Sequence, residues 1–332
     1  MGWKNGAFNR HLCRLPRRRS AVDMKSWAWK TTQPDSRPIN LPATRPGIRF
    51  QRAQSIFVRG ATMDLGRLGV WCFTDRLSPQ ELSELAQTTE RLGYSALWYV
   101  EAVSYESIAL GSFLLNQTEK LIIAPGIANI YARDATATKQ AQNSLDRFSG
   151  GRFLLGLGIS HAFLVENVRG HSYGKPVTTM RKYLDAMDKA AEFAPSVAAP
   201  PPTVLAALGP NMTKLAAERT AGALPYNVTP EHTSWARGLM GPGSWLCVEQ
   251  KICMTTDEDT WRAVAAKQLA RYMRLDNYRN NWLRLGFSED EFTGEASDRF
   301  LDAMCAWGTA DDIRARIKAH EDAGATHVCL QA

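Results

Sequence analysis

Three side chains that can transfer a proton stand after apolar stretches of this sequence. His161 ends the stretch GRFLLGLGISH, Glu101 directly follows SALWYV, and Asp75 comes two residues after RLGVWCF. Imidazole and carboxyl groups are common general acids and bases in enzymes, and an imidazole titrates near neutral pH. If the apolar stretches are strands, their ends bring acid–base chemistry together, and His161 is the best candidate for handling a proton.

The glycines before Ser160 do not form a dinucleotide-binding loop. In that fingerprint a third glycine follows the second by three residues at the start of a helix, but the residue at this position is His161. We therefore interpret Gly156 and Gly158 as residues that keep the end of a buried strand slim, so that a flat ligand can approach its backbone.

Each candidate also has an interpretation without catalysis. The imidazole of His161 could cap a following helix or bond a carbonyl group. Glu101 could be a solvated surface carboxylate, and Asp75 could belong to the turn before the next helix. In the loop NIYARD, Tyr131 and Arg133 could stack on or pair with an anionic ligand, or they could only brace the loop. These alternatives remain open at the level of the sequence.

Eight apolar stretches supply the strands that must position these residues. Most are continuous apolar runs, which is typical of strands buried on both faces of a parallel sheet. Helical segments separate nearly all of them, and eight such units without a phosphate-binding first turn predict an α/β fold, a (β/α)8 TIM barrel. In this fold the catalytic groups lie at the carboxyl ends of the strands. The predicted strands are 67–73, 95–100, 120–128, 151–161, 203–209, 222–228, 244–254 and 327–331.

Helix signals lie between the predicted strands. For residues 78–93, Ser78 is a preferred N-cap residue, Pro79 opens the helix and Glu81 completes a capping box. An insertion of two or three amphipathic segments over 255–308 follows strand seven, and we expect its tryptophans in a core or a dimer contact. The further predicted helices are 108–116, 135–148, 178–193, 211–219, 231–238 and 310–323.

The net charge of +7 originates in the first 62 residues. They carry 13 Lys and Arg against two acidic residues, contain five prolines, and show no period of 2 or 3.6. Such a composition does not support a packed core, so we predict a basic disordered extension over 1–62 and a barrel domain over 63–332. A basic arm can bind nucleic acid through its phosphates, but the rest of the chain is mildly acidic, and no nucleic-acid partner is expected.

The cysteines and the hydropathy argue against several classes of protein. The six cysteines are scattered without a Cys-x-x-Cys pair, which argues against a zinc site or a disulfide framework and favours a reducing cytoplasm. No apolar run reaches the roughly 20 residues that span a bilayer. His161 and His171 flank a loop that contains Glu166, but no further ligand has matching spacing, so we expect no metal.

The order of several motifs resembles a known family. Along the chain these motifs are LGRLGVW, RLGYSALWYVEAV, GIANIYARD, GGRFLLGLGISH, VRGHSY, LAALGP, YRNNWLRLGF and GTADDIRARIKAHEDAGATHVCLQ. Together they resemble the luciferase-like oxidoreductases, and among these the actinobacterial branch that uses coenzyme F420, a deazaflavin. The resemblance covers about residues 65–331. Each motif is weak alone, and the specificity lies in their order and spacing.

The resemblance implies a luciferase-like barrel with an insertion, a homodimer, and a deazaflavin or FMN bound across the carboxyl ends of the strands. It places Glu101 beside the ring of the cofactor. It also places Pro125 and Gly126 at a bulge of strand three that backs the ring and often holds a non-proline cis peptide, expected here before Gly126. Backbone contacts along the cofactor fall to Ile159 and Ser160.

The resemblance also implies which residues lie near the phosphate of the cofactor and which residues handle the proton. The resemblance places Ala206, Ala207 and Gly209 near the phosphate side chain of the cofactor, where a helix N-terminus offers free N–H groups to an anion. His161 and Asp75 stand where sugar-phosphate dehydrogenases of the family carry glutamates. Those enzymes also have a histidine just after the strand-two acid, where this chain has an alanine. The proton-handling groups are therefore rearranged, and the substrate of those enzymes is not carried over.

The implied function is hydride transfer between coenzyme F420 and a small organic substrate that the sequence does not name. The cofactor carries the hydride chemistry, while the protein orients the substrate and handles one proton. Two alternatives remain open: an FMN-dependent monooxygenase of the same fold, and a non-catalytic barrel that binds a cofactor. The presence of both His161 and Glu101 favours an enzyme.

Overall fold

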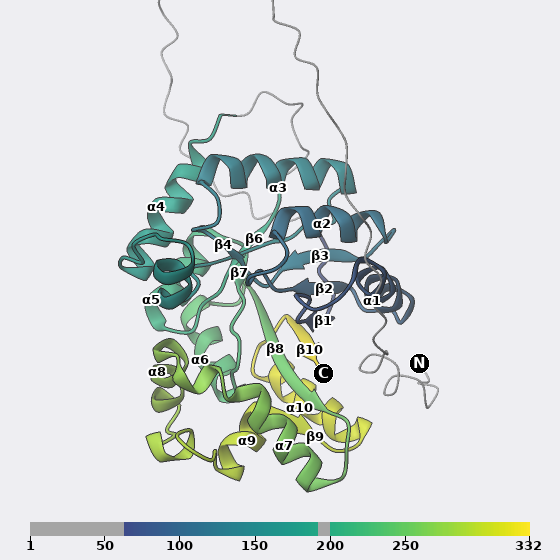
Figure 1. Cartoon of the computed structure of the whole chain (residues 1–332), viewed down its shortest axis with the longest axis vertical. Coiled ribbons are helices and arrows are strands. Elements are labelled where there is room, and N and C mark those ends of the chain that lie inside the picture. The colour runs from purple at the N-terminus through teal and green to yellow at the C-terminus, as the bar shows by residue number, and fades with distance from the viewer. Residues whose placement is uncertain (1–62, 192–199) are drawn as a thin grey trace, which may run out of the picture. The chain divides into compact units, whose positions relative to one another are not determined.

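The computed structural model describes residues 63–191 and 200–332 (Figure 1). The predicted basic extension, residues 1–62, lies outside the described residues, so the division of the chain at residue 63 stays a prediction. Among the helices that are described, none is long and apolar enough to cross a membrane.

Parallel strands form a closed ring inside a layer of helices. Their hydrogen-bonded order is β3-β2-β1-β10-β8-β7-β6-β5-β4. β3 and β4 are two parts of one strand interrupted at Gly126 and Ile127, so the pairing of β4 with β5 closes the ring. The predicted (β/α)8 TIM barrel is confirmed. The barrel strands are β1 (Leu68–Cys72), β2 (Ala96–Tyr99), β3 (Ile122–Pro125), β4 (Ala128–Asn129), β5 (Leu155–Gly158), β6 (Thr203–Leu205), β7 (Gly222–Ala223), β8 (Trp245–Cys253) and β10 (His327–Gln331).

The barrel helices begin where the sequence places capping residues. Ser78 and Glu81 form the predicted capping box of the first helix. Asp134 and Thr229 each accept a hydrogen bond from a backbone N–H in the first turn of the third and sixth helices, which satisfies donors that have no partner inside the helix. These helices are α1 (Pro79–Arg91), α2 (Ser107–Asn116), α3 (Ala135–Ser149), α4 (Pro176–Asp188), α5 (Pro210–Arg219), α6 (Pro230–Met240) and α10 (Ala310–Asp322).

Alternate residues along β8 face opposite sides of the sheet. Leu246 and Val248 belong to the core between strands and helices, whereas Cys247 belongs to the core inside the barrel. With a period of two, Glu249 and Lys251 face the barrel interior as well. The interior-facing side of β8 is therefore apolar at Cys247 and becomes charged toward the carboxyl end of the strand.

The insertion after β8 builds a small aromatic core of its own. Trp282 is fully buried, with Phe300 4.8 Å and Phe292 5.4 Å from its ring centroid. Trp261 stacks on Trp307 at 4.5 Å, so the insertion's tryptophans are core residues, one of the two roles expected for them. The inserted elements are α7 (Glu258–Leu269), a 3₁₀ turn (Tyr272–Arg274), α8 (Asp276–Arg284), a second 3₁₀ turn (Glu289–Glu291), α9 (Asp298–Met304) and β9 (Cys305–Trp307), which pairs with the end of β8.

Candidate active site

The predicted proton-transfer residues lie at one end of the barrel. His161 follows β5, Glu101 follows β2 and Asp75 follows β1. Because all strands run parallel, these carboxyl ends form one rim, which we call the mouth of the barrel. The residues differ in what they contact there.

His161 has an imidazole that is available for chemistry. Within the described residues neither ring nitrogen has a hydrogen-bond partner, and the ring lies 6.0 Å from the ring of Tyr278 in the insertion. Burial lowers the pKa of His161 below its ordinary value of 6.5, so the imidazole is neutral at pH 7. The π-helical turn Leu164–Val168 that follows receives no side-chain cap. The alternative in which this imidazole caps a helix or bonds a carbonyl is therefore not observed.

The backbone before His161 is held in an unusual conformation. Ser160 has φ = 59°, in the left-handed region that residues other than glycine seldom adopt. Its carbonyl oxygen accepts a hydrogen bond of 3.1 Å from the hydroxyl of Tyr173. Tyr131 in turn donates its hydroxyl hydrogen to the carbonyl oxygen of Tyr173. Tyr131 thus braces the loop beside His161, one of the two roles the sequence left open.

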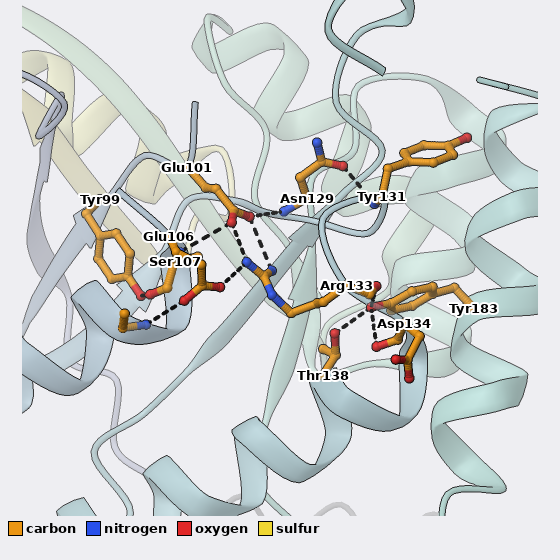
Figure 2. Close-up of polar contacts among 11 residues, drawn as sticks. Tyr99, Glu101, Glu106, Ser107, Asn129, Tyr131, Arg133, Asp134, Thr138 and Tyr183 are labelled. Atoms are coloured by element: carbon orange, nitrogen blue, oxygen red, sulfur yellow. Dashed lines mark hydrogen bonds and ion pairs between the residues drawn. The ribbon is translucent and has the colours of Figure 1, made fainter. Parts of the chain in front are cut away.

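Glu101 is buried and fully engaged by protein groups (Figure 2). Its side chain is 3% exposed and accepts hydrogen bonds from the backbone N–H groups of Asn129 (2.6 Å) and Ser107 (3.3 Å). Arg133 donates to both carboxylate oxygens and also pairs with Glu106, the N-cap residue of α2. Glu101 is therefore not a solvated carboxylate. It ties β2, β4 and α2 together at the mouth, and its predicted contact with a ring stays a prediction.

The interrupted strand β3–β4 forms the predicted bulge. A non-proline cis peptide joins Gly126 to Ile127, one bond later than the position expected from the resemblance. The N–H of Gly126 donates to the carbonyl oxygen of Tyr99 at 2.7 Å, and its own carbonyl oxygen accepts from the indole of Trp71 at 3.2 Å. Pro125 and the two residues after it thus form a fixed wall between β2 and β5.

The glycines of β5 leave the space that this bulge occupies. A Cβ atom at position 156 would lie 2.1 Å from the carbonyl oxygen of Pro125, and one at position 158 would lie 2.4 Å from the side chain of Ile127. The interpretation that Gly156 and Gly158 leave space for a flat ligand is therefore wrong, because the protein's own bulge fills that space.

The opposite side of the mouth has a helix N-terminus suited to an anion. α5 begins after Gly209, which provides no side-chain cap, and its first turn holds no acidic residue. The guanidinium of Arg284 in α8 lies 4.0 Å from the position of a Cβ at Gly209. Ala206 lies at the strand end before it, while Ala207 is 3% exposed in the outer core and offers only its backbone. Free N–H groups, the helix dipole and an arginine together favour an anion.

Aromatic rings connect the two sides across the mouth. Trp71 lies 5.1 Å from Tyr226, which lies 6.3 Å from Tyr278, and Tyr278 lies 6.0 Å from His161. No sequence pattern predicted a role for Trp71, Tyr278 or Arg284. Tyr278 and Arg284 lie in the motif YRNNWLRLGF, and this motif was the sequence signal that could have pointed to them.

Buried polar atoms without partners also gather at the mouth. Among the described residues they include Thr74 Oγ1, Asp75 Oδ1, Ser107 Oγ and both amide atoms of Asn227. The second oxygen of Asp75 accepts a 3.3 Å hydrogen bond from the N–H of Val103. Native proteins seldom leave such groups unpaired away from functional sites, so the arrangement fits a polar ligand. No three metal-binding side chains converge anywhere in residues 63–191 and 200–332.

The sequence of this chain matches a known protein family. Residues 59–327 match the family described as luciferase-like monooxygenase. The chain belongs to this family. The resemblance predicted from the motifs is thereby confirmed, and the fold is that of a luciferase-like protein.

Named relatives are similar to the chain over most of its length. A Mycobacterium tuberculosis protein, provisionally named a coenzyme F420-dependent oxidoreductase, is 26% identical and aligns over 82% of this chain and 96% of its own. The 5,10-methylenetetrahydromethanopterin reductase of Methanolobus tindarius is 23% identical over 75% and 89% of the two chains.

Solved structures confirm the fold. The coenzyme F420-dependent tetrahydromethanopterin reductase of Methanopyrus kandleri superposes with a TM-score of 0.61 at 18% identity, over 81% of this chain and 94% of the reductase. A type II Baeyer–Villiger monooxygenase of Pseudomonas putida, in complex with FMN, gives a TM-score of 0.61 at 14% identity, over 81% and 92%. Structures of both cofactor types thus share this fold.

Proposed function

We propose that the protein is a coenzyme F420-dependent oxidoreductase that transfers a hydride between the deazaflavin and a small organic substrate. The observation that carries this proposal is the similarity to the M. tuberculosis protein named for coenzyme F420, which extends over 82% of this chain. The two reductases, one related in sequence and one in structure, support the same class of reaction.

The residues at the mouth suit such a cofactor. The bulge at Pro125 and Gly126, with the indole of Trp71 bonded to it, offers a flat wall for a ring. The backbone of Ile159 and Ser160 would run along the cofactor. The N-terminus of α5 together with Arg284 would hold a phosphate, because both are positively polarised and α5 has no side-chain cap.

Bound deazaflavin supplies the hydride acceptor or donor, as cofactors generally carry this kind of chemistry. The protein must then handle one proton. When an alcohol is oxidised, the neutral imidazole of His161 takes the hydroxyl proton on one of its unbonded nitrogens, and it returns the proton when a carbonyl is reduced. Asp75, with one unpartnered oxygen, is the second candidate for this proton.

A second candidate function is an FMN-dependent monooxygenase. The FMN-bound monooxygenase of the same fold is the observation that favours it. We also propose that the enzyme is a homodimer, on the basis of the family resemblance, and a measurement of its mass in solution tests this. We place it in the cytoplasm because its cysteines are scattered, and cell fractionation tests that location.

A substrate screen tests the proposed reaction. Reduced coenzyme F420 is mixed with the protein and with ketones, enones and nitro compounds, and reoxidation is followed by the absorbance of the oxidised deazaflavin. We expect at least one class to be reduced without oxygen. Turnover that requires FMN and oxygen instead would support the monooxygenase.

A further inference from the structure

β8 carries two charged residues that face the barrel interior. The side chains of Glu249 and Lys251 are 1% and 3% exposed, and Lys251 Nζ lies 3.1 Å from Glu249 Oε1. Branched apolar residues normally fill this space in a TIM barrel. Burying an ion pair removes two charges from water, and well-packed apolar residues are often at least as stabilising. Packing alone therefore does not explain the pair.

The contacts of this ion pair converge on Tyr226. The ammonium group of Lys251 lies 4.0 Å from the centroid of the Tyr226 ring, a distance at which a desolvated cation is attracted to the ring face. Lys251 also donates to Gln331 Oε1 at 3.4 Å, and the hydroxyl of Tyr226 donates to the same oxygen at 2.8 Å. The hydroxyl of Tyr272 lies 3.0 Å from that of Tyr226. Both the face and the hydroxyl of the ring are fixed.

Glu249 also fixes the backbone that carries this ring. Its Oε2 accepts a 3.1 Å hydrogen bond from the N–H of Asn227, the residue after Tyr226. Asn227 has φ = 56°, in the left-handed region, so the chain turns sharply at this point. The ion pair therefore holds Tyr226 through its side chain and through its main chain.

Tyr226 itself is half-buried and lies in the middle of the mouth. Trp71, which is bonded to the bulge, is 5.1 Å from it on one side, and Tyr278, which neighbours His161, is 6.3 Å from it on the other. We propose that Tyr226 is a further ligand-contacting residue of this site and that Glu249 and Lys251 are its positioning residues. This inference rests on the proposed function, because it takes the ligand that contacts Tyr226 to be the F420 cofactor.

A double-mutant cycle tests the coupling. The double variant E249Q/K251M replaces the ion pair by uncharged side chains of similar size, so no charge is left unpaired in the barrel. Oxidised coenzyme F420 and FMN are titrated into the wild type, this variant, Y226L and the combined variant. We expect the double variant to bind the preferred cofactor about tenfold more weakly when Tyr226 is present and less than about twofold more weakly in the Y226L background. An equal loss in both backgrounds would overturn the proposal.

A second measurement does not depend on any ligand. The chain has nine tyrosines, and 3-fluorotyrosine labelling gives each one a ¹⁹F signal, of which the one lost in Y226F belongs to Tyr226. In E249Q/K251M the Tyr226 signal should shift and broaden while that of Tyr94, in the turn after α1, stays in place. The control T233V removes a buried hydroxyl bonded to His320 on the outer side of β8 and should leave the Tyr226 signal unchanged. An unmoved Tyr226 signal in E249Q/K251M would refute the positioning role.

The two measurements separate this inference from the proposed function. A wild type that binds FMN instead of F420 contradicts the proposed cofactor, and the cycle is then decided with FMN. A wild type that binds neither cofactor contradicts the proposed function, and also contradicts Tyr226 as a contact for either cofactor, while the ¹⁹F signal still decides whether the ion pair positions Tyr226.

Discussion

A Cβ atom at position 156 would lie 2.1 Å from the carbonyl oxygen of Pro125. Glycine on β5 is therefore required by the bulge on the neighbouring strand. The bulge in turn carries the hydrogen bond from Trp71 to Gly126 that closes this wall of the mouth. One side chain at position 156 would disturb the wall without touching a ligand.

The first prediction follows from this contact. G156A should lower the melting temperature by many degrees, because a methyl group cannot overlap a backbone oxygen and the strands must separate. The matched control is G238A in α6, where a Cβ meets nothing within 4 Å; alanine there should stabilise the helix by about 1 kcal/mol. Thermal unfolding of both variants checks the prediction, and a G156A protein as stable as G238A would contradict it.

The second prediction concerns His161. Its alanine variant should bind the deazaflavin within a few-fold of the wild type and turn over about 10²–10⁴-fold more slowly, as expected for a lost general acid or base. Alcohol oxidation needs the neutral imidazole, whose pKa lies below 6.5. The wild-type rate should therefore fall as the pH drops through that lowered pKa, and the variant should lack this dependence.

A second histidine serves as the control for this experiment. His171 lies ten residues further on, is exposed, and has its ring 6.2 Å from that of Tyr131. H171A should keep the wild-type turnover and pH profile. If H161A behaved like H171A, His161 would have no catalytic role and Asp75 would be tested next.

Arg133 gives the third prediction. R133M leaves the carboxylate of Glu101 buried without its cation, and breaking a buried pair in this way costs about 3–5 kcal/mol of unfolding free energy. The double variant E101Q/R133M should recover part of the loss because no buried charge remains unpaired; Glu106, the other partner of Arg133, is half-exposed to water. Urea unfolding measures both, with R67M as the control, since Arg67 is 71% exposed in its pair with Glu321 and such pairs contribute at most about 1 kcal/mol. Equal stabilities of R133M and R67M would show that the buried pair is unimportant.

Acid should destabilise the fold through three buried histidines, which is the fourth prediction. Burial lowers the pKa of His232 and His327 to about 4 and that of His320 to about 3, from an ordinary 6.5. Below pH 6.5 the unfolded chain binds protons that the folded protein does not bind, so the unfolding free energy falls as the pH drops toward these values. These three histidines should contribute nearly three protons to its slope near about pH 5, and H320N should lower the slope by about one proton. A stability that does not change between pH 7 and about 5 would refute this.

The strand positions could be predicted from the sequence because buried parallel strands are continuous apolar runs. The same signal cannot show where pairing stops. The predicted strand 120–128 is interrupted at Gly126 by the bulge, and the predicted strand 222–228 pairs over Gly222–Ala223 only. The short strand β9 (Cys305–Trp307) was missed because it is held by the end of β8 and has no pattern of its own.

The site could be predicted only as far as strand ends determine it. His161, Glu101 and Asp75 follow strands, so the fold alone brings them to one rim. Arg284 and Tyr278 reach the same rim from an insertion whose docking leaves no periodic signal. The pairing of Arg133 with Glu101 depends on how one loop folds over another, which spacing along the chain does not specify.

The choice of cofactor gives the fifth prediction. Fluorescence titrations of oxidised coenzyme F420 and of FMN, run side by side on the purified protein freed of bound cofactor, measure the two dissociation constants directly. We expect submicromolar-to-micromolar binding of coenzyme F420 and much weaker binding of FMN. Tighter binding of FMN would contradict it and favour the monooxygenase.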